Sequence, residues 1–283
     1  MCVVRRLLTI TCCALGVVTS SCSPAAPTPA SPSLSLAAPP ATAVPSTESI
    51  GRIALAPADP GGLCEHLLWP LRDGASWAYQ ATGITGLDSL MLTSRLIEGG
   101  IELTVGGNTS RLNCLDGALA GLPPGLFGSG HPDLGPAVTA TNPRDAYLPA
   151  PAWLLPLGSA VEWSTELDPG GTILLPIAPG TPLPVSAGRL VVSSYASDLV
   201  PVAVSAGTLS ALRVHQSMLY AIDVTLPDGG TSQAFIDASS EVYFVERIGP
   251  VRIQYLGGTV TTPEGTWTLP PGGELTLQES HLP

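Results

Sequence analysis

Glycine and proline interrupt this chain so often that long helices are excluded. The 283 residues include 31 Gly and 30 Pro. Apart from a weak helical pattern around residues 63–68, no stretch keeps helical spacing of apolar residues for three turns without meeting one of them. Both residues disfavour helix interiors and favour turns. Between them lie short apolar or alternating runs, a pattern typical of strands. We therefore expect an all-β fold.

The clearest strand signal is Ser76–Thr82, where apolar and polar residues alternate. Two hairpins are predicted, 90–96 with 101–105 and 219–226 with 231–236, because the intervening glycine-rich sequences supply the positive φ that a tight reversal requires. Further short strands are expected at 242–245, 251–255, 259–262, 267–269 and 274–277.

Residues 115–156 contain too many glycines and prolines for regular sheet. The segment is nevertheless rich in large apolar residues, among them Leu126 and Phe127, so we expect it to pack as a cover over one end of the sheet. Long loops of this kind often carry function. The sequence His131-Pro132-Asp133 in this loop is therefore a candidate site, although X-Pro-Asp is also a common turn.

The first 21 residues have the features of a signal peptide. Arg5 and Arg6 precede an uncharged run over residues 7–18, which is too short to span a bilayer. Small residues then lead to Cys22 in an arrangement that resembles the lipobox of bacterial lipoproteins, with Thr19 where leucine is usual. We expect Cys22 to be lipidated; the alternative is ordinary secretory cleavage after Ser20.

Residues 22–60 are mostly Pro, Ala, Ser and Thr. Such a segment cannot bury a core, and we interpret it as an extended tether with a reach on the order of 100 Å at about 3 Å per residue. A lipid-anchored domain needs a spacer of this kind, whereas a freely secreted domain does not. The remaining residues, 61–283, are expected to form one β-rich extracytoplasmic domain that is attached to the membrane through the N-terminal lipid.

The charge balance excludes some partners. The chain has 11 Arg, no Lys and 22 Asp and Glu. Because two of the arginines lie in the signal peptide, the mature protein has nine cationic side chains and a formal charge of −13. Nucleic acids and anionic lipid surfaces bind clustered Lys and Arg, so neither is an expected electrostatic partner.

Two cysteines remain in the folded domain, Cys64 and Cys114. In an oxidising compartment they most simply form one disulfide bond. The alternative is a metal site at Cys64-Glu65-His66. No CxxC or HxxxH spacing supplies a second pair of ligands, so we expect neither a metal nor a cofactor.

Other polar residues are weaker candidates. Glu162 and Glu166 would share one face of a strand with Asp168 close by, which would suit sugar or Ca²⁺ binding, although a solvated face is the simpler interpretation. His215 falls inside a predicted strand, 212–220, and is expected to be a half-buried sheet residue. The nucleophile motif G-x-S-x-G does not occur.

Four passages of the folded part contain recognisable motifs: LWPLRDGASWAYQ (68–80), VPVAVSAGTLSALRV (200–214), VYFVERIGPVRI (242–253) and GELTLQE (273–279). Together they resemble the motifs of a group of uncharacterised exported β-rich lipoproteins of bacteria. The first matches the pattern P-L-x-x-G-x-x-W-x-Y and the second V-x-V-x-A-G-T. The matched positions cover about a fifth of the chain. Pro250 departs from the pattern and removes a backbone donor, which puts strand pairing there in doubt.

The resemblance implies a twisted antiparallel sheet, a half-barrel or flattened barrel akin to those of lipoprotein and lipid carriers, and it implies no catalytic residues. We therefore expect a non-enzymatic envelope lipoprotein that binds an apolar or amphiphilic ligand, or an envelope partner, in the concavity of the sheet. The aromatic residues expected to line that concavity or to fill its core are Trp69, Trp77, Tyr79, Trp153 and Trp163. The alternative is an extracellular hydrolase with His131, Asp133 and an unidentified nucleophile in the loop 115–156.

Overall fold

The computed structural model describes residues 64–283. The predicted signal peptide (1–21), the lipidation site Cys22, the tether (22–60) and the first residues of the predicted domain lie outside the described residues. Those expectations therefore stay predictions.

Short helices are α1 (Leu126–Ser129), the 3₁₀ turn η1 (Pro132–Leu134) and α2 (Pro151–Leu154). The strands before α2 are β1 (Glu65–His66), β2 (Trp69–Pro70), β3 (Ser76–Thr82), β4 (Ser89–Ile97), β5 (Gly100–Val105), β6 (Asn108–Leu115), β7 (Ala118–Ala120) and β8 (Val138–Thr141). The strands after it are β9 (Val161–Leu174), β10 (Pro182–Val204), β11 (Gly207–Thr225), β12 (Thr231–Val245), β13 (Gly249–Thr262), β14 (Gly265–Leu269) and β15 (Gly273–His281).

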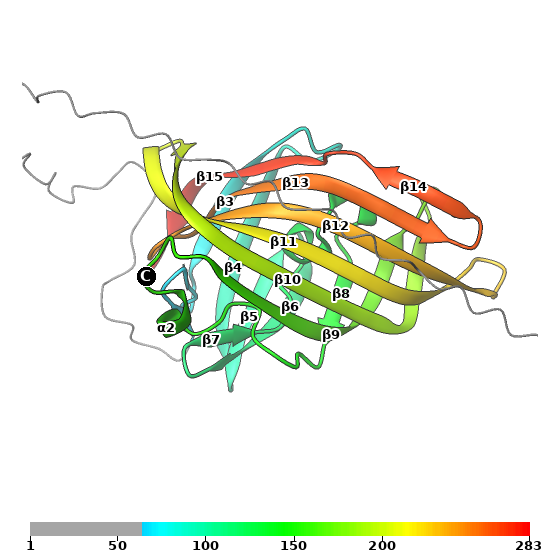
Figure 1. Cartoon of the computed structure of the whole chain (residues 1–283), viewed down its shortest axis with the longest axis horizontal. Helices are drawn as coiled ribbons and strands as arrows, with labels where there is room; N and C mark the ends of the chain where they lie inside the picture. The colour runs from blue at the N-terminus through cyan, green and yellow to red at the C-terminus, as the bar shows by residue number, and fades with distance from the viewer. Residues whose placement is uncertain (1–63) are drawn as a thin grey trace, which may run out of the picture. The chain divides into compact units, whose positions relative to one another are not determined.

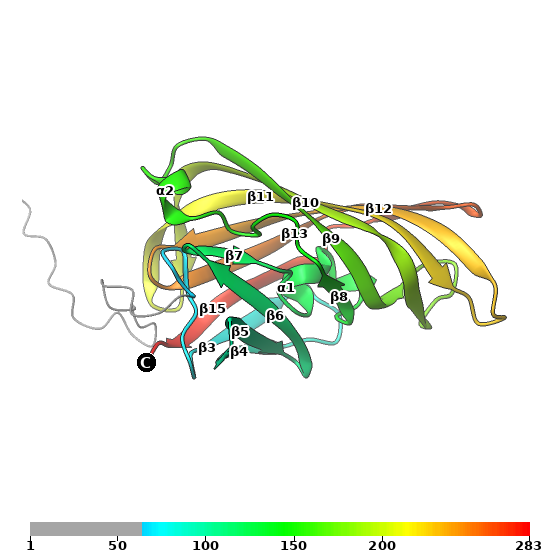
Figure 2. The same ribbon diagram turned by 90° about the horizontal axis from the view of Figure 1, so that it is seen from below.

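Within residues 64–283, one antiparallel sheet contains every strand except β1 and β2, which pair with each other. Its order is β7-β6-β5-β4-β3-β15-β13-β12-β11-β10-β9-β8, and β14 pairs with β13. The sheet curls into a half-barrel, with α1 on its enclosed side (Figures 1 and 2). The predicted all-β half-barrel is confirmed.

Strands β9–β13 are much longer than the sequence predicted. Strand β10 has 23 residues and β11 has 19. Glycines bend these strands instead of ending them: the predicted strands 251–255 and 259–262 are one strand, β13, which continues through Gly257 and Gly258 with a register shift against β12. The predicted strand Ser76–Thr82 and both predicted hairpins are confirmed.

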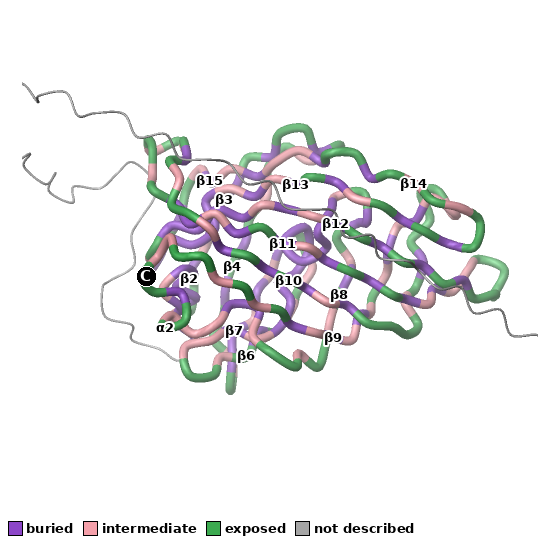
Figure 3. The backbone as a smooth tube through the Cα atoms, viewed as in Figure 1, coloured by how far each residue is buried: buried purple, intermediate pink, exposed green. Residues whose placement is uncertain are grey.

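Burial alternates along the strands, so the sheet has an inner side that packs on the core and a solvent side (Figure 3). In β12, for example, Ala234, Ile236 and Ala238 are buried, whereas Phe235 and Asp237 between them are exposed. This alternation makes the solvent side of β9–β13 a broad polar surface with scattered apolar residues.

The segment 115–156 packs as a cover, as predicted, and it places α1 against the inner side of the sheet. Phe127 of α1 is buried. The phenol of Tyr255 on β13 donates to Leu126 O (3.1 Å), and the phenol of Tyr220 on β11 donates to Ser129 O (3.1 Å). These bonds satisfy carbonyl groups that a short helix leaves unpaired. The expectation that this segment holds no regular sheet was wrong, because β7 and β8 lie within it.

The weak helical pattern at residues 63–68 does not correspond to a helix. The described part of this segment forms β1 and the turn into β2.

Pro250 lies opposite Phe244, next to a register shift between β12 and β13. Its carbonyl accepts a hydrogen bond from the Tyr79 phenol (2.7 Å). The shift lets the pairing of β12 and β13 continue past a residue that cannot donate.

Candidate functional site

The inner side of the sheet is filled by aromatic side chains. Trp69, Trp77 and Tyr79 are fully buried. The ring of Phe127 from α1 lies 6.3 Å from Trp69 and 5.3 Å from Tyr79, and the Trp77 indole donates to Ile248 O (2.7 Å). Trp69, Trp77 and Tyr79, which were predicted either to line a ligand site or to fill the core, are therefore packed in the core. The segment 115–156, which we call the cover segment, occupies the space in the concavity where a ligand was expected.

The other two predicted aromatic residues lie apart from this cluster. Trp163 on β9 is partly buried against the core, and its indole donates to Tyr147 O (2.8 Å). Trp153 on α2 is 74% exposed and belongs to neither a core nor a described pocket. The five predicted aromatic residues therefore do not line one common pocket.

The histidine of the hydrolase alternative is fully buried and already bonded through both ring nitrogens. Nδ1 of His131 accepts from the backbone N–H of Asp133 (3.2 Å), and Nε2 donates to Pro270 O (2.7 Å). The carboxylate of Asp133 lies 3.9 Å from Nδ1. A general base needs a free lone pair directed at its substrate, and the lone pair on Nδ1 is occupied here. His131 therefore has a structural role in capping η1.

His66 is held in the same way. Its Nδ1 accepts from the N–H of Leu68 (3.0 Å) and its Nε2 donates to Pro149 O (2.8 Å). Burial lowers the pKa of His66 to about 4, against the opposing effect of the bond to Pro149. This neutral imidazole joins the start of the domain to the cover segment.

Cys64 and Cys114 form a disulfide bond, as predicted. Their neighbour Glu65 pairs with Arg72 at 2.6 Å. In the part of the chain that the structure describes, no three His, Cys, Asp or Glu side chains are grouped as metal ligands. Cys64, the one cysteine of the alternative metal site, is thus committed to the disulfide.

Glu162 and Glu166 do share the solvent side of β9, but they have different surroundings. Glu166 forms ion pairs with Arg144 and Arg189. Asp168 accepts from the amide of Asn142 (2.8 Å). These contacts fix the edge of the sheet at β8 and β9, and they leave Glu162 as the member of the predicted carboxylate group that is available to a ligand.

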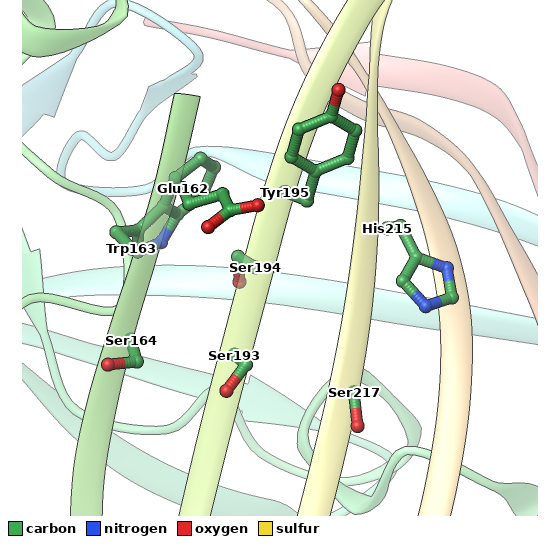
Figure 4. Close-up of a pocket in the computed structure, with 8 residues that line it drawn as sticks. All are labelled: Glu162, Trp163, Ser164, Ser193, Ser194, Tyr195, His215 and Ser217. Atoms are coloured by element: carbon green, nitrogen blue, oxygen red, sulfur yellow. The ribbon is translucent and has the colours of Figure 1, made fainter. Parts of the chain in front are cut away.

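Glu162 lines a hollow of about 470 Å³ on the solvent side of β9, β10 and β11, which we call the polar trough (Figure 4). Strand register sets its rows: Glu162, Tyr195 and His215 lie opposite one another across the three strands. The residues that line the polar trough are Glu162, Trp163, Ser164, Ser193, Ser194, Tyr195, His215 and Ser217. The small serine side chains next to the larger row make this part of the face hollow.

His215 was predicted to be half-buried and is exposed instead, because the odd-numbered residues in this part of β11 face solvent while Val214 and Gln216 face the core. Within residues 64–283, no side-chain hydrogen bond or ion pair is formed by Glu162, Tyr195 or His215. The polar trough therefore presents a carboxylate, a phenol and an imidazole that are not committed to other parts of the described domain.

A second hollow, of about 260 Å³, lies at the rim of the half-barrel between the cover segment and strands β4 and β5. We call it the rim pocket. Most of its lining is apolar, with polar atoms from Thr85, Asn108 and Asp133. Its lining residues are Ile84, Thr85, Leu87, Leu90, Val105, Gly106, Asn108, Leu126, Pro132, Asp133 and Pro136.

The sequence predicted neither hollow as a unit, although Glu162, Trp163, His215 and Asp133 were among the candidate residues that it offered. Residues of the polar trough come from three strands separated by tens of residues, and residues of the rim pocket come from four segments. Strand order and register bring them together, and neither can be read from local periodicity.

None of the helices within residues 64–283 has the length and apolar character of a membrane span.

No protein-family model matches the sequence, and no curated protein matches it. Two solved structures are similar to the chain. The first, from Bacteroides fragilis, is described as an exported protein with a YmcC-like fold; it is 13% identical with a TM-score of 0.41, over 76% of this chain and 99% of its own. The second, from Parabacteroides distasonis, is described as a lipoprotein; it is 12% identical with a TM-score of 0.36, over 77% of this chain and 99% of its own.

Proposed function

We propose that this chain is a non-enzymatic lipoprotein of the cell envelope whose folded domain binds the apolar part of an amphiphilic ligand in the rim pocket. The observation that carries the proposal is the apolar lining of that pocket, in which Ile84, Val105 and Leu126 are buried and Leu87 and Leu90 are partly buried. Apolar pockets with a few polar groups are the usual form of small-molecule sites.

The size of the rim pocket limits the ligand. Its volume of about 260 Å³ lies just below the range of about 300–1,000 Å³ that is common for ligand pockets. A short alkyl chain or a single ring fits such a space. Asn108 and Asp133 are among the few polar residues of the lining, and we assign the polar end of the ligand to them.

The non-enzymatic part of the proposal rests on His131. The cover segment was the expected place for a hydrolase site, and the histidine there donates to Pro270 O and accepts from Asp133 N. The hydrogen bonds that hold it would have to break before it could accept a proton from a nucleophile.

The anchor is tested by Cys22→Ala. The lipidated protein should partition with membranes, whereas Cys22→Ala should be recovered in the soluble fraction outside the cytoplasm, because the lipid is the proposed membrane attachment. Persistent membrane association of the variant would contradict the anchor and would leave the rim pocket proposal untouched.

The rim pocket is tested with mature Cys22→Ala protein and the apolar fluorophore N-phenyl-1-naphthylamine. Binding should raise the fluorescence of the probe, and native mass spectrometry with organic extraction should show whether a lipid co-purifies. Leu90→Glu should weaken probe binding by about tenfold or more, because it places a carboxylate in an apolar pocket.

The matched control is Met91→Glu. Met91 is the next residue on β4, and its side chain is 52% exposed on the solvent side. This substitution adds the same charge without entering the rim pocket, so the probe should bind as it does to the parent protein. Equal binding by both variants would refute the rim pocket as the site.

A further inference from the structure

The solvent side of the sheet carries an apolar surface directly beside the polar trough. Leu219 and Phe235 are 47% and 51% exposed on β11 and β12. Leu219 lies opposite Val191 on β10, and Phe235 lies opposite Ala221. These four residues, which we call the apolar strip, line a hollow of about 340 Å³ together with Arg189 and Asp237.

The polar trough continues into the apolar strip along the same strands. On β10 the solvent-side residues run Tyr195, Ser193, Val191, and on β11 they run His215, Ser217, Leu219. Each step of two residues is about 6.6 Å, so the row of Tyr195 lies about 13 Å from the row of Val191.

The combined face is small. From Tyr195 to Arg189 it is about 20 Å long, and the five strands that line its two hollows, β9–β13, span about 19 Å, because strands lie about 4.8 Å apart. A stable protein interface buries about 800 Å² on each partner. A surface of this size fits a short extended segment better than it fits a second folded domain.

The charges on this face favour a basic partner. The arginines on the solvent side of β10, β11 and β13 all have carboxylate partners: Arg189 pairs with Glu166, Arg213 with Asp198 and Arg252 with Glu274. Glu162 and Asp237, in contrast, make no ion pair or side-chain hydrogen bond with the described residues. The excess charge on the face is therefore negative.

The rest of the domain has the same sign. Residues 64–283 contain 8 Arg and 20 Asp and Glu, and no Lys, which gives a formal charge of −12. A second copy of the domain would meet this face with like charge. This like charge favours a different molecule as the source of the cation that complements Glu162.

We propose that this face docks a short basic segment of a partner protein in an extended conformation. A Lys or Arg side chain of the segment lies between the carboxylate of Glu162 and the ring of Tyr195, and an apolar side chain four residues further along rests on the apolar strip. Glu162 and Tyr195 are direct cross-strand neighbours, and the Glu162 carboxylate extends toward Tyr195 (Figure 4).

The two contacts reinforce each other. The ring attracts a cation through its quadrupole, and the neighbouring carboxylate attracts the same cation by charge. Tyr195 is 40% exposed, so its ring is accessible from solvent. The segment contact is independent of the rim pocket, whose lining residues belong to other strands and to the cover segment.

The probe for the test is a nonapeptide of Gly, Ser and Thr in which one lysine and one leucine are four residues apart. Titration into mature Cys22→Ala protein, followed by backbone amide NMR shifts, should perturb β9, β10 and β11 around Glu162, Tyr195 and Leu219. Glu162→Gln and Tyr195→Ala should each weaken peptide affinity by about fivefold, because each removes one partner of the cation.

The matched control is Glu98→Gln, which removes the same charge in the turn between β4 and β5 and should leave peptide affinity unchanged. A peptide with glutamate in place of the lysine should not bind. Unfolding midpoints of Glu162→Gln and Tyr195→Ala should match the parent, so that lost binding is not lost folding.

Three outcomes would overturn the proposal: equal weakening by Glu98→Gln, tetramethylammonium binding as tightly as the peptide, and Glu162-dependent binding of phosphatidylethanolamine vesicles without peptide binding. The first would mean general charge attraction, the second a small-cation site and the third a lipid headgroup site. A failure of the rim pocket test would leave all of these measurements intact.

Discussion

His66 couples the stability of the domain to pH. Burial lowers its pKa from 6.5 to about 4. The unfolded chain therefore takes up a proton below about pH 6.5 while the folded chain does not, so the free energy of unfolding should fall as the pH decreases from about 6.5 to about 4. The contribution of this one group is on the order of 3 kcal/mol.

The variant His66→Asn should lack this contribution. An asparagine oxygen can still accept from the N–H of Leu68, but the bond to Pro149 is lost, so the variant should be about 1 kcal/mol less stable at neutral pH. Urea unfolding across this pH range should give a shallower pH dependence for the variant than for the parent. Identical slopes in parent and His66→Asn would disprove the role of His66.

Gly258 lies at a close approach of two strands, β12 and β13. A Cβ atom at this position would lie 1.8 Å from the backbone oxygen of Asp237 on β12. Gly258→Ala should therefore force β12 and β13 apart and lower the free energy of unfolding by about 2 kcal/mol or more. In the control Gly170→Ala the nearest atom is the Thr139 hydroxyl oxygen at 3.3 Å, which can move, so thermal unfolding should show a smaller loss. Equal losses would contradict this account.

At the scale of elements, α1 depends on the sheet for its position. It has four residues, its first-turn N–H groups receive no side-chain cap, and Leu126 O is bonded to the Tyr255 phenol. Tyr255→Phe should leave that buried carbonyl unpaired and cost about 1–2 kcal/mol. Hydrogen exchange should become faster at the amides of Gly128 and Ser129, both of which bond to Gly125 O. Tyr195→Phe, on the solvent side, should change neither quantity.

The ends of a strand could be predicted from the sequence where a turn motif fixes them. The hairpin of β11 and β12 follows from Asp228 and Gly229: the Asp228 carboxylate accepts from Gly230 N (2.9 Å), and Gly229 has a φ of 85°. The lengths of β9–β13 could not be predicted in the same way, since glycine and proline have no fixed effect inside a strand. Whether they end it or bend it depends on the neighbouring strand.

At the scale of the whole molecule, the disulfide closes a loop between residues 50 positions apart. Loop closure of that length should stabilise the fold by roughly 4 kcal/mol. Reduction of Cys64–Cys114 should therefore lower the unfolding midpoint in urea markedly. The double variant Cys64→Ala, Cys114→Ala should show the lower midpoint with and without reductant; a midpoint that responded to reductant in that variant would have another origin.

The overall class of the molecule was predictable, and its candidate sites were not. Alternation and turns indicated an antiparallel sheet, and the resemblance implied its curl. The pairing of β3 with β15, however, joins residues some two hundred positions apart. The row of Glu162, Tyr195 and His215 likewise depends on pairing between strands, and a shift of one residue in either register would turn one of these side chains into the core.

The disulfide also determines how mechanical force would pass through the domain. A pull that arrives along the chain from residue 63 reaches Cys64 and can cross its sulfur atoms directly to Cys114 on β6. The residues between the two cysteines, which include the aromatic core strand β3, are then bypassed by the load. An oxidised domain under tension should yield first elsewhere, and only reduction would allow its N-terminal strands to be peeled away one after another.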